Sequence, residues 1–158
     1  MAALKIISSY KVKIKHYNKI FADTANIFRM AIAFFIQVCD SEWAVLKPLA
    51  GKQRNNYLES ITHATVKYPN PKYGFDKDFY KMPSYLRRAA MQQALGGYSS
   101  YKSSLENWEN SDKSGKKPTM ATDRNMTPTL YKGNMYIRTD RIRQESKYSI
   151  KTTGFGWK

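Results

Sequence analysis

The segment at residues 84–108 carries polar side chains at a spacing that could place them against nucleic acid. If the segment is helical, one row along it holds small or hydrogen-bonding residues: Ser84, Arg88, Gln92, Gly96, Ser99 and Ser103. Arginine pairs with guanine edges or phosphate, glutamine with adenine edges, and serine with either. We therefore predict that this row and the neighbouring Arg87 bind nucleic acid. The alternative is an ordinary solvated helix face.

Two adjacent glycines interrupt the same segment. Each glycine inside a helix costs roughly 1 kcal/mol relative to alanine, so the pair needs an explanation. Gly97 follows Ala90 and Ala94 on the apolar side, and we predict that it lets a neighbouring helix approach closely. Gly96 lies on the polar row, where the missing side chain leaves room for a ligand.

A row of lysines near the N-terminus is a second candidate surface. Residues 4–15 alternate between apolar and polar side chains, as a half-buried strand does. Lys11, Lys13 and Lys15 fall on the exposed side, where they could face phosphates. The alternative is an edge strand that uses lysine against aggregation.

Composition favours a polyanionic partner. The 158 residues include 27 Lys and Arg against 12 Asp and Glu, a formal net charge of +15, which favours nucleic acid. Cys39 is the only cysteine and there are two histidines, so a disulfide framework and a structural zinc site are excluded. The most apolar stretch, residues 27–39, is shorter than the roughly 20 residues of a membrane span. We expect a cytoplasmic, nucleoid-associated protein with no membrane partner.

These candidate residues must be positioned by a mixed α+β fold. Helical periodicity is expected at 17–47, 53–66 and 84–109, and strand-like runs at 4–15, 129–137 and 147–153. The N-terminal strand and the C-terminal strands are expected to share one sheet. The predicted domains are a β domain of residues 1–16 and 126–158 and a helical insertion of residues 17–125.

The sequence offers no catalytic constellation. Acidic pairs stand at Asp76/Asp78 and Glu106/Glu109 with no third carboxylate in evident range, whereas two-metal phosphodiester chemistry needs a clustered set. We expect no catalytic residue, no metal site and no cofactor, and a chain that binds without cutting.

The order of the motifs resembles the N-terminal half of a TnpB (OrfB-type) insertion-sequence protein, related to type V CRISPR effectors. The matching pieces cover nearly the whole chain: "YKVKIKHY" (10–17), "NIFRMAIAFF" (26–35), the proline-led helix 82–108, the "KSGKKP" loop (113–118) and "LYKGNMY" (130–136).

The resemblance implies a small β-barrel-like sheet, the wedge domain, that holds guide RNA, and a helical recognition insertion that contacts double-stranded target DNA. By motif position it adds Lys132 and Asn134 to Ser84, Arg88 and Gln92 as binding residues. The family's RuvC-type nuclease has no counterpart in these 158 residues, so we expect a separate nuclease half to be a partner. A stand-alone DNA-binding repressor, or an assembly protein that uses its apolar helices, is the alternative.

Overall fold

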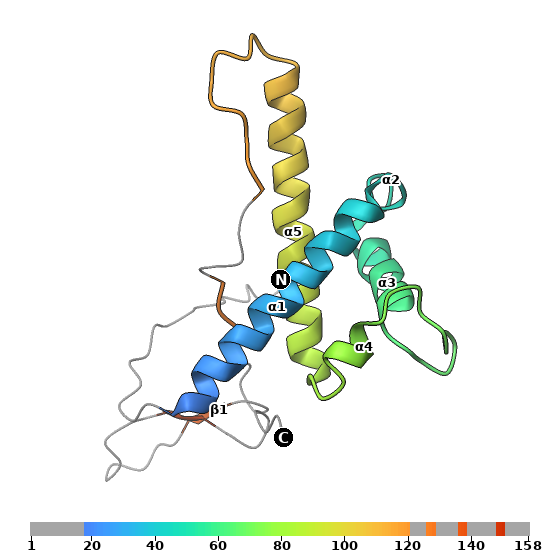
Figure 1. The fold of residues 1–158 in the computed structure, drawn as a ribbon, viewed down its shortest axis with the longest axis vertical. Coiled ribbons are helices and arrows are strands. Elements are labelled where there is room, and N and C mark those ends of the chain that lie inside the picture. The colour runs from blue at the N-terminus through green and yellow to red at the C-terminus, as the bar shows by residue number, and fades with distance from the viewer. Residues whose placement is uncertain (1–17, 121–125, 129–135, 139–147, 151–158) are drawn as a thin grey trace, which may run out of the picture.

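In the computed structural model, residues 18–120, 126–128, 136–138 and 148–150 are described. The described residues contain five helices and two short strands, in the order α1 (Lys19–Ser41), α2 (Trp43–Leu46), α3 (Gly51–Thr62), α4 (Phe75–Asp78), α5 (Ser84–Glu109), β1 (Tyr136–Arg138) and β2 (Tyr148–Ile150). The two long helices, α1 and α5, cross each other, and α2 and α3 lie to one side of the crossing (Figure 1).

The crossing of α1 over α5 forms the centre of the core. On α1, apolar residues three and four apart are buried, among them Phe28, Ile32 and Phe35, each 0% exposed. On α5, the buried Ala90 and Ala94 present little side chain to α1, so the two helices can approach closely. Asn18 caps the start of α1, since its Oδ1 accepts a hydrogen bond from the Ile20 amide at 3.0 Å.

A cluster of phenylalanines fastens the segment before α5 to α1. The Phe75 ring stacks on Phe35 with centroids 4.9 Å apart and on Phe79 with centroids 4.7 Å apart. Phe34 meets Phe75 edge to face at 5.3 Å. Such pairs add to the burial of apolar area, so a segment rich in proline and lysine is nevertheless anchored to the core.

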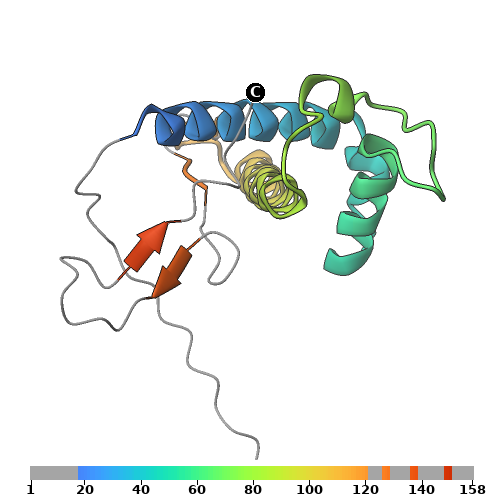
Figure 2. The same cartoon turned by 90° about the horizontal axis from the view of Figure 1, so that it is seen from below.

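The prediction of an α+β fold with a barrel-like sheet is wrong for the described part of the chain, which is a helical body. Its sheet is a single antiparallel pair, in which Tyr136 of β1 faces Ile150 of β2. This pair lies on the opposite side of α5 from α3 (Figures 1 and 2). The physical reason is that α1 and α5 bury their apolar faces against each other, so the core of this body is built without a sheet.

The strand expected at residues 4–15 lies outside the described residues. The domain division into 1–16 with 126–158 and 17–125 stays a prediction.

Helix α1 also bears on the expectation of a soluble protein. It is 23 residues long and reaches a mean hydropathy of 1.3, so by length and composition it could cross a membrane. The argument from the shorter stretch 27–39 therefore does not hold. In the structure, α1 packs one face against α5, as core helices of soluble proteins also do. Localisation stays a prediction.

Candidate nucleic-acid interface

A groove runs beside α5, on the side where α2 and α3 meet. It consists of two hollows, of about 370 Å³ and about 390 Å³, which share Arg54 and Ser99 in their walls. The inner hollow lies between α5 and the first turns of α3 and is lined by Gly51, Arg54, Asn55, Gln92, Leu95, Gly96, Ser99 and Ser100. The outer hollow is lined by Trp43, Lys47, Arg54, Ser99, Lys102, Ser103, Leu105, Glu106 and Glu109.

The α5 wall of this groove includes most of the predicted polar row. Gln92, Gly96 and Ser99 line the inner hollow, and Ser99 and Ser103 line the outer one. The opposite side of α5 carries the apolar stripe, since Leu86, Ala90, Ala94 and Tyr98 are at most 2% exposed. Ser84 and Arg88 are exposed nearer the start of α5, beyond the residues that line the groove. The row is therefore on the surface, and its role in binding stays a prediction.

Gly96 lies where the sequence analysis expects open space. A Cβ atom built on it meets no atom within 4 Å, and the residue forms part of the groove wall. Gly97 corrects the sequence analysis, because a Cβ atom there also meets nothing within 4 Å among the described residues. The close approach of α1 to α5 therefore depends on Ala90 and Ala94 and does not require Gly97.

The facing wall is built around Arg54 and Trp43. Arg54 donates from Nε to the Leu46 carbonyl at 2.9 Å and from Nη2 to the Lys47 carbonyl at 2.7 Å. These bonds satisfy carbonyls at the end of α2 and hold the guanidinium 5.7 Å from the centre of the Trp43 ring. The other support of Trp43 is Tyr98, with ring centroids 5.0 Å apart. The groove thus has a fixed aromatic and cationic wall.

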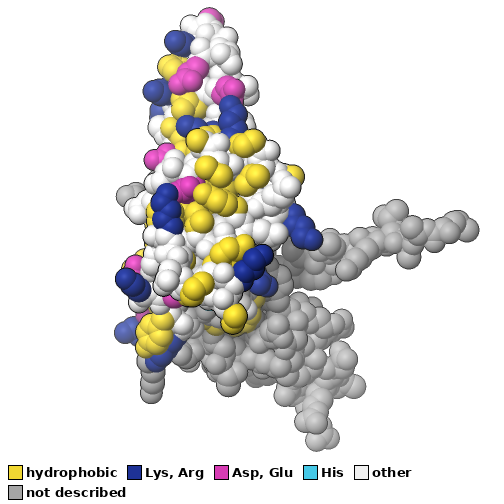
Figure 3. Space-filling model, turned by 90° about the vertical axis from the view of Figure 1, so that its right-hand side faces the viewer, with side chains coloured by type: hydrophobic (Ala, Val, Ile, Leu, Met, Phe, Trp, Pro, Cys, Tyr) yellow, Lys and Arg dark blue, Asp and Glu magenta, His cyan; other side chains and the backbone are white. Residues whose placement is uncertain are grey.

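Charges of both signs line the outer hollow. Lys47 lies 3.4 Å from Glu106, and both side chains are about 60% exposed. Lys102 lies over the Tyr98 ring at 5.9 Å from its centre. On the side of the molecule shown in Figure 3, Lys and Arg side chains are scattered among hydrophobic ones and form no continuous patch.

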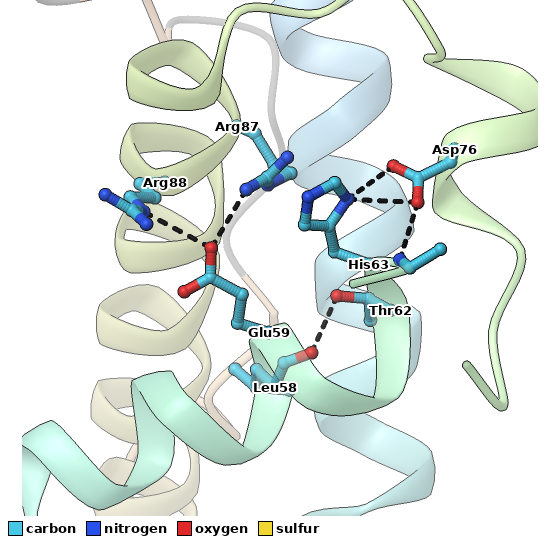
Figure 4. Close-up of polar contacts among 8 residues, drawn as sticks. Leu58, Glu59, Thr62, His63, Asp76, Arg87 and Arg88 are labelled. Carbon is cyan, nitrogen blue, oxygen red and sulfur yellow. Dashed lines mark hydrogen bonds and ion pairs between the residues drawn. The ribbon is translucent and has the colours of Figure 1, made fainter. Parts of the chain in front are cut away.

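Arg87 and Arg88 contact the same carboxylate, and this corrects the placement of Arg87 on the surface. Glu59 of α3 accepts from Arg87 Nη2 at 2.9 Å and from Arg88 Nε at 3.3 Å (Figure 4). Burial alone would raise the pKa of the Glu59 carboxyl, but the hydrogen bond from Arg87 and the charge of Arg88 hold that pKa below its usual value. Arg87 is 8% exposed, so it joins α3 to α5. Arg88 remains exposed.

The other predicted binding residues, Lys11, Lys13, Lys15, Lys132 and Asn134, lie outside the described residues. The sequence shows that their segments hold much of the charge. Residues 1–17 and 121–158 contain 12 Lys and Arg against 3 Asp and Glu, whereas residues 18–120 contain 15 against 9. Among the described residues, no group of three His, Cys, Asp or Glu could hold a metal ion.

Sequence analysis did not identify Trp43, Arg54 and Lys102 as groove residues. Trp43 extends the apolar pattern of the helix expected at 17–47, and this pattern predicts a structural role for it. In the structure the Trp43 ring packs against Tyr98 of α5, and the turn between α2 and α3 brings Arg54 beside it. The one available signal was the break at Pro48 and Gly51, which predicts a turn there but not its direction.

Comparison with known proteins gives a family but no activity. The model of the Aq_aa04 family matches residues 8–152. The uncharacterized protein aq_aa04 of Aquifex aeolicus (strain VF5) is 30% identical over 104 residues, which are 63% of this chain and 58% of that protein. The chain thus spans less than two thirds of the length of this curated relative. No solved structure matches. Because the family model covers most of the sequence, the chain belongs to the Aq_aa04 family.

Proposed function

We propose that this chain binds nucleic acid and that the groove beside α5 is one of its contact surfaces. The observation that carries the proposal is the chemistry of that groove. Gln92, Ser99 and Ser103 line it and make no side-chain hydrogen bond within the described part of the chain. Facing them are an aromatic ring and a guanidinium, which suit bases and phosphates.

The net charge of +15 supports the same proposal. Basic residues neutralise backbone phosphates and release counterions, which drives binding of any sequence. Because the charge is densest in residues 1–17 and 121–158, we assign most phosphate contacts to these segments and the more selective contacts to the groove.

In its fuller form, the proposal follows the resemblance to TnpB. The chain would hold guide RNA and contact target DNA as the non-catalytic part of a transposon-encoded RNA-guided nuclease, with a separate nuclease half supplying the chemistry. A stand-alone repressor would share the binding but would not need RNA.

Fluorescence anisotropy with the full chain tests the proposal. The probes are a labelled structured RNA, a single-stranded DNA and a duplex of equal length, each titrated at several salt concentrations. We expect binding whose logarithm falls linearly with the logarithm of salt concentration. Replacing Lys11, Lys13 and Lys15 together with glutamine should flatten the slope by up to roughly 3, because each phosphate contact contributes about 0.7–0.9. Absence of binding to every probe at low salt would contradict the proposal.

The dependence on RNA separates the two forms. Sequence-selective duplex binding that needs an added RNA supports the RNA-guided form. Equally selective duplex binding without RNA supports the repressor and contradicts the RNA-guided form.

A further inference from the structure

We infer that the groove beside α5 takes a single nucleic-acid strand and does not take a duplex. This inference rests on the proposed function and names the form of nucleic acid that the groove binds. It departs from the sequence-based expectation that the 84–108 helix contacts a target duplex.

The first argument is shape. A helix that contacts base edges in a duplex must protrude, because it enters a major groove about 12 Å wide. The polar row of α5 is largely exposed, but along the groove it does not protrude alone, because residues of α2 and α3 line the same hollows. Gln92 and Gly96 form a wall of a hollow whose other side is the first turns of α3, and Ser103 lies across from Trp43. Because α2 and α3 flank this part of α5 (Figure 1), we expect these helices to hold the major groove of a duplex away from the row.

The second argument is size. The two hollows hold about 370 Å³ and about 390 Å³, volumes within the range of roughly 300–1,000 Å³ typical of small-molecule pockets. Nucleotides of a single strand can enter such spaces one at a time, because their bases are not stacked in a duplex. Arg54 and Ser99 line both hollows, so the two hollows are adjacent, and adjacent nucleotides of one strand could occupy both.

The third argument is the order of the chemical groups along the groove. The inner hollow holds uncharged hydrogen-bonding side chains, namely Asn55, Gln92, Ser99 and Ser100, which suit base edges and ribose hydroxyls. The Asn55 Oδ1 atom is buried and has no hydrogen-bond partner in the described structure, so no protein contact fixes that end of the amide. The outer hollow holds the Trp43 ring and the cations Lys47 and Lys102, which suit base stacking and phosphates.

Glu106 and Glu109 weaken phosphate binding at the outer end of the groove. Their carboxylates would repel phosphate, and Glu106 already pairs with Lys47 at 3.4 Å. The strand must therefore compete with Glu106 for Lys47. The pair is exposed, and such pairs contribute little, so the competition is feasible. Removing the Glu106 charge should then strengthen single-strand binding.

The experiment compares Gly96→Leu with its matched control Gly97→Leu. Both sites have open space at Cβ, both substitutions remove a helix glycine, and only Gly96 lines the groove. Each variant is titrated by anisotropy with a short single-stranded RNA, the DNA strand of the same sequence, and the DNA duplex. Thermal melts confirm that each variant is folded, and Ser99→Leu serves as a second groove variant.

We expect Gly96→Leu and Ser99→Leu to weaken single-strand binding about tenfold or more, the scale of losing one stacked base. Gly97→Leu should change it less than about threefold, and duplex binding should not change in any of them. Glu106→Gln should strengthen single-strand binding about twofold at low salt, by the weak coupling typical of exposed charges.

Two results would overturn the inference and leave the proposed function standing. One is equal weakening of strand and duplex by Gly96→Leu, because the groove would then serve both. The other is no change in single-strand binding for either groove variant. If the unmodified chain binds no probe at all, the proposed function fails and the inference fails with it.

Discussion

The polar residues around α3 are used in two opposite ways. On the side toward the loop before α5, the carboxylates of Glu42, Glu59 and Asp76 are each bonded to another part of the chain. Glu42, 5% exposed, accepts from Lys72 at 2.5 Å, from the Tyr73 hydroxyl at 2.6 Å and from the Tyr57 hydroxyl at 2.8 Å. His63 at the end of α3 bonds Asp76 at 2.8 Å (Figure 4). These contacts join segments that are far apart in the sequence.

On the groove side, α5 carries the charged residues Lys102, Glu106 and Glu109 at the outer hollow. Its neutral side chains Gln92, Ser99 and Ser103 have no hydrogen-bond partner among the described residues. The difference teaches how to separate structural from functional polar residues in this protein. Buried charge that is paired holds the fold, because leaving either partner unpaired is costly. Neutral polar groups that line a hollow without partners add nothing to that framework and remain available to a ligand.

The largest effect should come from breaking the Glu42 cluster. The hydrogen bonds from Lys72, Tyr73 and Tyr57, in that order, hold the pKa of Glu42 at about 2, below its usual value of 4.5. Glu42→Gln should lower the free energy of unfolding by about 3 kcal/mol at neutral pH. Urea unfolding measures the change, and nucleic-acid binding by the folded variant should be unaltered.

The same cluster predicts a pH dependence. A carboxylate whose pKa is lower in the folded state stabilises the fold fully above its unfolded pKa and loses that effect as the pH falls toward the folded pKa. The difference between the parent and Glu42→Gln should therefore be full above about pH 5, and it should shrink between pH 4.5 and 2. A difference that is the same at pH 7 and pH 3 would show that charge is not the cause.

The next effect distinguishes two adjacent arginines. Arg87→Met removes the buried partner of Glu59 and should destabilise the fold by about 2 kcal/mol, because Arg88 still pairs with Glu59 and limits the loss. Arg88→Met removes an exposed ion pair and should cost less than about 1 kcal/mol. Thermal melts of the two variants measure the contrast. Equal losses would mean that burial does not separate the two residues.

The spacing of apolar residues alone predicted the position of α5 and part of its buried side. The expected helix at 84–109 is confirmed as Ser84–Glu109. The apolar side predicted for it is buried in its first half, at Leu86, Ala90, Ala94 and Tyr98, and only half-buried further on, at Tyr101, Leu105 and Trp108. The expected helix at 17–47 is interrupted at Glu42, between the end of α1 at Ser41 and the start of α2 at Trp43. A three- to four-residue period specifies which side of a helix is apolar, so these features follow from local sequence.

The features that could not be predicted from the sequence depend on contacts between distant residues. Spacing placed Arg87 beside Arg88 but could not reveal Glu59, which is 28 residues away and buries one arginine while leaving the other exposed. In the same way, the groove exists because the turn after α2 brings Arg54 of α3 beside Trp43 and opposite α5. The barrel-like sheet was expected from the resemblance to TnpB, and neither the resemblance nor the strand patterns included the packing of α1 on α5.

A smaller effect tests the glycine pair by stability alone. Neither glycine has a neighbour within 4 Å of a built Cβ, so alanine fits at both. Gly96→Ala and Gly97→Ala should each raise the free energy of unfolding by roughly 0.5–1 kcal/mol, because alanine has the higher helix propensity. Chemical denaturation checks both. A loss of stability for Gly97→Ala would show that Gly97 is needed for close helix packing after all.

The smallest effect concerns the ion pair at the outer end of the groove. Lys47 and Glu106 are each about 60% exposed and 3.4 Å apart, and exposed pairs of this kind contribute roughly 0–1 kcal/mol. Glu106→Gln should therefore change stability by less than about 0.5 kcal/mol, and raising the salt concentration should remove even that difference. A double-mutant cycle with Lys47→Gln isolates the coupling of the two side chains. A coupling well above 1 kcal/mol would mean that this pair stabilises the fold, as the contacts of Glu42 do. Lys47 would then not be available to a bound strand.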